Sequence, residues 1–179
     1  GGRLAAAIEI LDDIERRHRP AADALKDWGL SHRFAGAGDR AAIGNIVYDA
    51  LRRRCSAAFV MGGDAPRAIA FGALLLEGGH VEALDAAMAD DRFAPPPLDR
   101  SERAVIAENM RRDMPDMVRA DAPDWCRPHL EAAFGEAWPD EAAALSGRPP
   151  LDLRVNRLKS DRDRVLAELA QAGAVPAPL

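Results

Sequence analysis

The sequence has few cysteines and no long apolar run, and both absences restrict the kind of protein it encodes. Its 179 residues include two cysteines, Cys55 and Cys126, with no C-x-x-C pair. A disulfide-rich scaffold is therefore excluded, and we expect reduced thiols. No uninterrupted apolar stretch approaches the roughly 20 residues of a membrane span, and no charged-then-apolar leader precedes the first amphipathic segment. We expect a cytoplasmic protein that does not interact with a membrane.

An excess of positive charge is also missing. The chain has 24 Lys and Arg against 29 Asp and Glu, a formal net charge of -5, whereas many stand-alone nucleic-acid binders carry a global basic field. Any contact with RNA must therefore come from a local patch. Only Lys26 and Lys159 are lysines. A GC-rich genome explains this preference for arginine, which supports phosphate binding only where arginines cluster.

Apolar residues at helical spacing dominate the first 146 residues. One helix is predicted over 3–19, and a second begins at Pro20 and ends at Gly29, so that the two pack as a hairpin. The most regular amphipathic pattern covers 39–61, which we expect to be the central helix. Further helices are predicted over 66–76, 81–88 and 101–110, the last with a capping box formed by Asp99 and Glu102.

The pattern changes at Gly147. Leu151, Leu153 and Val155 alternate with polar residues, which predicts a strand over 151–157. A helix start at Ser160 follows, and Gly173 closes that helix. The predicted fold is therefore mainly α, with a helical bundle over 1–146 and the first strand and helix of a truncated α+β domain over 147–179.

No catalytic, cofactor-binding or metal-ligating residue can be identified. The four histidines, His18, His32, His80 and His129, are scattered without any metal-ligand spacing. Cys55 follows three arginines, which favours a lowered thiol pKa. No histidine is close in sequence to act as its base, so a small buried residue is the better interpretation. The three tryptophans are expected to be interhelix anchors.

Two groups of residues are candidates for RNA binding. Arg154 and Asn156 point to the same side of the predicted strand, with Arg157 and Lys159 following at its end, so that the group suits a nucleic-acid backbone. An inter-domain or helix-capping contact is the alternative. The second group, on the predicted central helix, consists of Arg52, Arg53 and Arg54. These arginines are either an RNA-facing patch together with Arg40 or a solvated face with an ion pair to one of the many acidic residues.

Three stretches of the sequence resemble one family. Residues 150–159 are similar to the P-x-x-L-R-V-N-x-L-K motif that opens the RNA-binding subdomain of the Sun (Fmu) family of RNA cytosine-5 methyltransferases. Residues 123–136 resemble the family's P-x-W-L and F-G-E elements, with Cys126 in place of leucine. Residues 39–52 resemble the D-R and V-Y-G-x-L-R helix of the family's N-terminal NusB-like domain, with Asp49 in place of glycine.

The resemblance implies a NusB-like helical domain joined to the start of a methyltransferase RNA-binding subdomain. It also implies an S-adenosylmethionine-dependent enzyme that makes 5-methylcytosine in ribosomal RNA through a cysteine nucleophile. In that family the cofactor domain and the catalytic cysteines lie downstream of these motifs, so Cys55 and Cys126 do not inherit their role. We expect these 179 residues alone to bind no cofactor and to be inactive. The alternatives are a NusB-type transcription factor that binds RNA or protein, and a helical adaptor.

Overall fold

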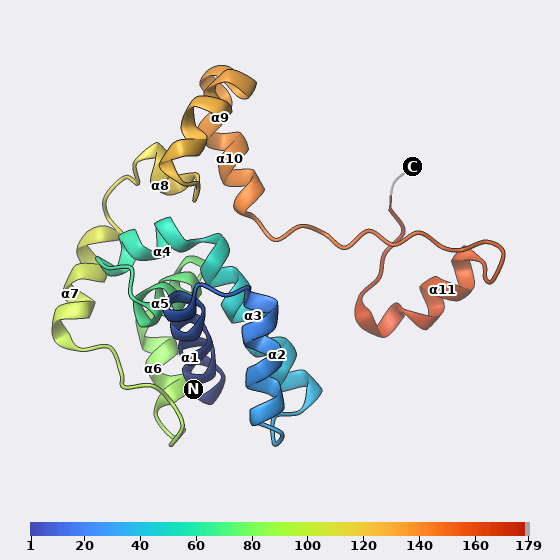
Figure 1. The fold of residues 1–179 in the computed structure, drawn as a ribbon, viewed down its shortest axis with the longest axis horizontal. Helices are drawn as coiled ribbons and strands as arrows, with labels where there is room; N and C mark the ends of the chain where they lie inside the picture. The colour runs from blue at the N-terminus through green and yellow to red at the C-terminus, as the bar shows by residue number, and fades with distance from the viewer. Residues whose placement is uncertain (178–179) are drawn as a thin grey trace. The chain divides into compact units, whose positions relative to one another are not determined.

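The computed structural model describes residues 1–177, and within them all regular structure is helical (Figure 1). The chain forms two compact units, which we call unit 1 (Gly1–Gly147) and unit 2 (Arg148–Leu179). The prediction of a mainly α protein is confirmed. The helices of unit 1 are α1 (Gly2–Arg17), α2 (Ala21–Ser31), α3 (Ala37–Arg52), α4 (Arg54–Met61), α5 (Pro66–Leu76), α6 (Val81–Met88), α7 (Arg100–Asn109), α8 (Asp116–Arg119), α9 (Arg127–Phe134) and α10 (Trp138–Ser146). Short 3-10 turns precede α9 and α10.

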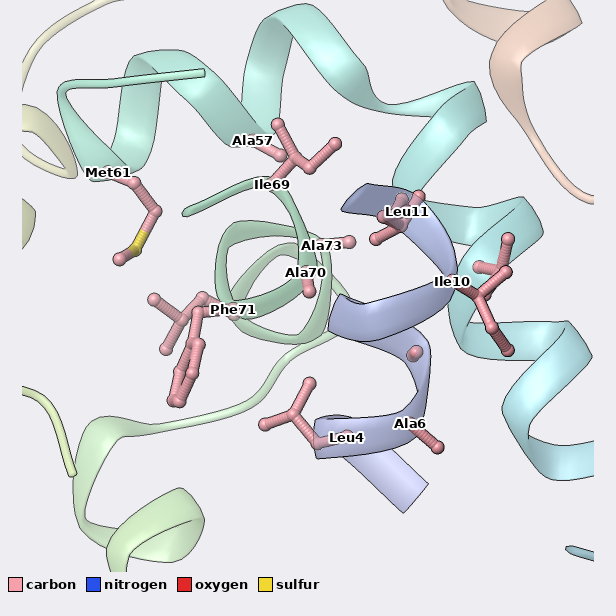
Figure 2. Packing of buried hydrophobic residues seen from close by; sticks show 14 of the residues in the cluster. Leu4, Ala6, Ile10, Leu11, Ala57, Met61, Ile69, Ala70, Phe71 and Ala73 are labelled. Carbon is pink, nitrogen blue, oxygen red and sulfur yellow. The ribbon is translucent and has the colours of Figure 1, made fainter. Parts of the chain in front are cut away.

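The centre of unit 1 is α5, which packs against α1, α3 and α4. Six of its eleven residues are buried, on all sides of the helix, as expected for a helix that is apolar all round. Figure 2 shows side chains of α1, α4 and α5 meeting in this core. A Cβ added to Gly72 would lie 2.5 Å from the carbonyl oxygen of Ala57, so the close crossing of α4 and α5 depends on that glycine.

The predicted central helix over 39–61 is wrong in two respects. It is divided at Arg53 into α3 and α4, and α5 takes the central position. The division has a visible cause at the first turn of α4. There the carboxylate of Asp121 accepts hydrogen bonds from the backbone N–H of Ser56 (2.8 Å) and from its hydroxyl (2.6 Å). The first backbone N–H groups of a helix have no acceptor within it, and at α4 the distant carboxylate of Asp121 supplies one.

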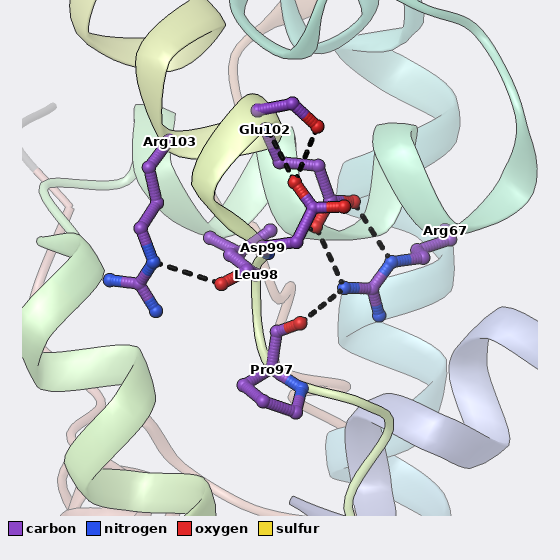
Figure 3. Close-up of polar contacts among 7 residues, drawn as sticks. Arg67, Pro97, Leu98, Asp99, Glu102 and Arg103 are labelled. Carbon is purple, nitrogen blue, oxygen red and sulfur yellow. Dashed lines mark hydrogen bonds and ion pairs between the residues drawn. The ribbon is translucent and has the colours of Figure 1, made fainter.

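A network of arginines and carboxylates fixes the loop before α7 to α5 (Figure 3). The capping box predicted at Asp99 and Glu102 is present, with both of its hydrogen bonds. Glu102 also accepts from Nε of Arg67 (3.1 Å), whose Nη2 donates to the carbonyl of Pro97 (3.2 Å). Arg103 donates to the carbonyl of Leu98 (2.9 Å). The proline-rich segment is therefore held in place without regular structure of its own.

A second, smaller hydrophobic cluster joins α8 to α10. Its buried members are Ala120, Trp138 and Ala142, with Met117 and Leu130 packed at its edge. The guanidinium of Arg127 lies 5.7 Å from the centre of the Trp138 ring, a cation-π arrangement. Trp138 is thus an interhelix anchor, as predicted.

Unit 2 contains α11 (Arg162–Glu168), whose first turn is capped by the carboxylate of Asp161. The predicted strand over 151–157 is absent from the described residues: 151–156 have no regular structure, and a turn occupies 157–159. A strand is defined by hydrogen bonds to a neighbouring strand, and no described segment supplies them. The alternating residues over 151–157 are therefore not part of a sheet within the described residues.

Among the described residues, no single helix is long and apolar enough to cross a membrane.

Candidate nucleic-acid interface

The cations around the turn of unit 2 are exposed and unpaired. Arg154, Arg157 and Lys159 are all exposed. Within residues 1–177, no hydrogen bond or ion pair engages their side chains. Cations that are not neutralised by the protein remain available to an anionic partner. We call these three residues the turn cations.

Asn156 shapes the turn that carries these cations. Its side-chain Oδ1 accepts a hydrogen bond from the backbone N–H of Leu158 (3.0 Å). Its carbonyl oxygen accepts from the N–H groups of Lys159 (2.9 Å) and Ser160 (3.0 Å). This is the local side-chain-to-backbone bonding that makes asparagine a turn residue. The structure therefore gives Asn156 a turn-forming role, and the prediction that it contacts RNA stays a prediction.

Charge is distributed unevenly between the two units. Unit 2 has six basic and four acidic side chains, a net charge of +2, whereas unit 1 has 18 basic and 25 acidic ones, a net charge of -7. The part of the chain with a net positive charge is therefore unit 2. A polyanion would be repelled by unit 1 at long range, and its favourable electrostatic contacts would be short-range ones with unit 2.

The three arginines at the α3–α4 break have carboxylate neighbours. Arg52 forms an ion pair with Asp49, and Arg54 forms one with Glu15 of α1. Arg53 is half-buried and lies at the division itself, close enough to Asp121 to favour the charged form of that carboxyl. For Arg52 and Arg54 the alternative of ion pairing is therefore the one observed. A role of the three in RNA binding stays a prediction.

Cys55 is half-buried, not fully buried as predicted. Burial is the largest cause of a raised pKa for this thiol, and the nearby carboxylate of Asp121 raises it further. The interpretation of Cys55 as a structural residue agrees with this direction, since a nucleophilic cysteine requires a lowered pKa. No group of three or more His, Cys, Asp or Glu side chains that could hold a metal ion is found among residues 1–177.

Sequence reasoning missed several exposed apolar residues. Trp125, expected to be an anchor, is 72% exposed, whereas Trp138 is 7% exposed. In unit 2, Leu151 and Leu158 are 83% and 97% exposed. The alternating pattern that predicted a strand identified Leu151 as an apolar position. It could not show that the described residues leave this side chain uncovered.

Comparisons with known proteins identify similar sequences. The family described as "Methyltr_RsmF/B-like, ferredoxin-like domain" matches residues 122–178, the segment that contains the turn cations. The chain is 44% identical over 68 residues to ribosomal RNA small subunit methyltransferase B of Pseudomonas putida, covering 38% of this chain and 15% of the relative. It is 38% identical over 74 residues to the protein of the same name from Shigella flexneri serotype 5b, covering 41% and 16%.

These alignments span about 15% of the length of the curated relatives. No solved structure matches the chain significantly. The family match over residues 122–178 and the two relatives lead to the same conclusion as the motifs quoted above. Residues 122–178 are thus similar to this RsmF/B-like family, and the quoted motifs resemble the Sun (Fmu) family.

Proposed function

We propose that this chain is the RNA-targeting N-terminal region of an S-adenosylmethionine-dependent ribosomal RNA cytosine-5 methyltransferase. The observation that carries the proposal is the family match over 122–178, together with the three unpaired cations inside it. Relatives that match 38% and 41% of the chain are named as ribosomal RNA methyltransferases. Ribosomal RNA is accordingly the proposed substrate.

The turn cations act by binding phosphates. Each exposed guanidinium or ammonium releases counterions when it contacts the RNA backbone, and it holds the RNA without reading its bases. The turn formed by Asn156 fixes the backbone over residues 156–160, which carries Arg157 and Lys159, and this limits the entropy lost on binding. In this proposal unit 2 orients the RNA, and none of the described residues has a catalytic role.

S-adenosylmethionine supplies the methyl group when it is bound, but the described residues do not fit it. The groove between α1 and α2 has a volume of about 380 Å³ and is rich in charged side chains. Those side chains already have partners: Arg19 bridges Asp13 and Asp27, and the indole N–H of Trp28 donates to Glu9. In this proposal the cofactor and the catalytic cysteine belong to a part of the protein outside these 179 residues, as the resemblance implies.

Unit 1 is proposed to be the NusB-like domain of the same protein. The alternatives, a NusB-type transcription factor and a helical adaptor, would both lack the methyltransferase reaction. Deleting the gene tests the choice directly, because 5-methylcytosine in ribosomal RNA can be located by bisulfite sequencing. We expect one 5-methylcytosine to disappear on deletion and to return with the gene. An unchanged pattern would contradict the enzymatic function.

A further inference from the structure

A groove between α2 and α3 has a lining unlike the rest of unit 1. It has a volume of about 330 Å³ and is lined by Ala22, Leu25, Lys26, Trp28, Arg40, Ile43, Gly44 and Tyr48. Two of these eight residues are cationic and none is acidic, although unit 1 as a whole has a net charge of -7. We call this surface the α2–α3 groove.

Both cations of the groove have free hydrogen-bonding capacity. Arg40 uses Nε to donate to the carbonyl of Ala35 (3.0 Å). Its two terminal nitrogens have no hydrogen bond or ion pair within residues 1–177, and neither has the ammonium of Lys26. The neighbouring groove between α1 and α2 differs, since its lining includes four carboxylates. The charge of the α2–α3 groove therefore favours an acidic ligand.

The floor of the groove favours an apolar ligand that approaches closely. A Cβ placed on Gly44 would meet no atom within 4 Å, so the space above this glycine is open. Arg40, Gly44 and Tyr48 lie at four-residue intervals along α3, which gives a row about 12 Å long at 1.5 Å per residue. This length matches two turns of a partner helix.

Three exposed large hydrophobic side chains lie on the hairpin formed by α2 and α3: Leu30 (58%), Phe34 (85%) and Tyr48 (41%). The ring of Trp28 stacks on His32 at 4.2 Å, and His32 meets Phe34 edge-on at 5.6 Å. These contacts give the α2–α3 loop a fixed shape beside the groove. Exposed apolar surface of this kind marks interaction sites.

We propose that the α2–α3 groove binds an acidic, amphipathic helical segment of a partner protein. A large apolar side chain of that segment occupies the space over Gly44, and its carboxylates pair with Lys26 and Arg40, in the helix-in-groove mode. RNA is a poorer occupant, because two cations offer few phosphate contacts against the charge of unit 1. The indole face of Trp28 that contacts His32 is also unavailable for stacking on a base.

The test uses a displayed library of 14-residue helical peptides in which acidic and basic amphipathic patterns are equally represented. Peptides of this library are selected for binding to the whole chain and to two variants of it. Gly44→Leu fills the open space over the groove, whereas Gly38→Leu makes the same change on α3 outside the groove, where an added Cβ also meets nothing within 4 Å. We expect acidic peptides with a large apolar residue to be enriched on the wild type and on Gly38→Leu, and to bind Gly44→Leu at least tenfold more weakly.

Charge reversal gives a second readout. Lys26→Glu should weaken the selected acidic peptides and improve binding of their lysine-substituted versions. The proposal is overturned if no peptide is enriched, if basic peptides dominate, or if Gly44→Leu binds as the wild type does. It is also overturned if Gly44→Leu abolishes binding of a single-stranded RNA or self-association in sedimentation, since either would identify a different occupant. Circular dichroism of each variant verifies that the helices are intact.

Discussion

Asp121 caps α4 from 65 residues away, through two hydrogen bonds to Ser56. The backbone of Asp121 is left-handed, with φ of 48°, a conformation that aspartate adopts more readily than most residues. At the other end of α4, the side-chain amide of Asn109 donates to the carbonyl of Phe59 (2.8 Å). Both ends of this eight-residue helix are therefore held by one later segment of the chain.

Replacing Asp121 by alanine should lower the free energy of unfolding by about 2 kcal/mol, the upper range for loss of a helix cap. The Ser56 N–H would lose its acceptor. Asp121→Asn keeps an acceptor oxygen and should cost clearly less. Urea denaturation followed by circular dichroism measures both. An equal loss of unfolding free energy in the two variants would show that the hydrogen bonds to Ser56 are not the stabilising interaction.

The pH dependence of stability should also change when Asp121 is replaced by asparagine. Burial raises the pKa of its carboxyl above its ordinary value of 3.8, against the opposing hydrogen bonds of Ser56. The folded state then binds a proton more tightly than the unfolded state, so this group's contribution to stability falls as the pH rises from 3.8 through the raised value. The wild type should therefore lose stability relative to Asp121→Asn over that interval.

Other carboxyl groups have the opposite effect on the pH dependence of stability. Hydrogen bonds from Ser101 and the Glu102 backbone lower the pKa of Asp99, and Arg67 lowers that of Glu102. Their contributions are lost on acidification, in the wild type and in the variant alike. The difference between the two proteins at each pH therefore isolates Asp121. A constant difference from pH 3 to pH 7 would contradict the raised pKa.

Gly72 and Gly44 should respond oppositely to alanine. A Cβ at Gly72 meets the Ala57 carbonyl at 2.5 Å, whereas one at Gly44 meets nothing within 4 Å. Gly72→Ala should destabilise unit 1 by about 2 kcal/mol through overpacking. Gly44→Ala should stabilise it by up to about 1 kcal/mol, since glycine is a poor residue inside a helix. Thermal denaturation of the two variants verifies the signs, and a stabilised Gly72→Ala would contradict the close crossing of α4 and α5.

A charge placed at Val47 should unfold unit 1. This side chain is fully buried on α3, and an unpaired buried carboxylate costs several kcal/mol. Ala41→Asp, on an exposed position of the same helix, is the control and should keep the wild-type melting temperature. If Val47→Asp melts as the wild type does, the amphipathic pattern of α3 has been misinterpreted.

The helices could be predicted where their signals are local. The start of α5 at Pro66 and the capping box of α7 depend on residues within one turn of each other. The break at Arg53 could not, because the carboxylate that caps α4 belongs to Asp121. Gly29 was expected to end α2, but it lies inside the helix. A Cβ added to Gly29 would lie 3.6 Å from Nε of Arg40, at ordinary van der Waals distance.

The candidate site shows the same division between local and distant information. The ion pair of Arg52 with Asp49 joins residues three positions apart, whereas that of Arg54 with Glu15 joins residues 39 apart. The alternation over 151–157 marked the right segment of the family motif but predicted a strand. A strand requires a partner segment, and periodicity along one segment carries no information about that partner.

Removing one turn cation tests the central claim, that these residues bind the RNA backbone. In the full-length protein, Arg154→Ala should weaken binding of ribosomal RNA fragments of any sequence and reduce the salt slope of the affinity by about one unit. Its melting temperature should not change, because the Arg154 side chain has no partner in residues 1–177. Arg164→Ala is the matched control, since Arg164 is paired with Glu168 at 3.0 Å and should contribute little to RNA affinity. Fluorescence anisotropy across a salt series measures both variants. Wild-type affinity and salt slope in Arg154→Ala would contradict the account.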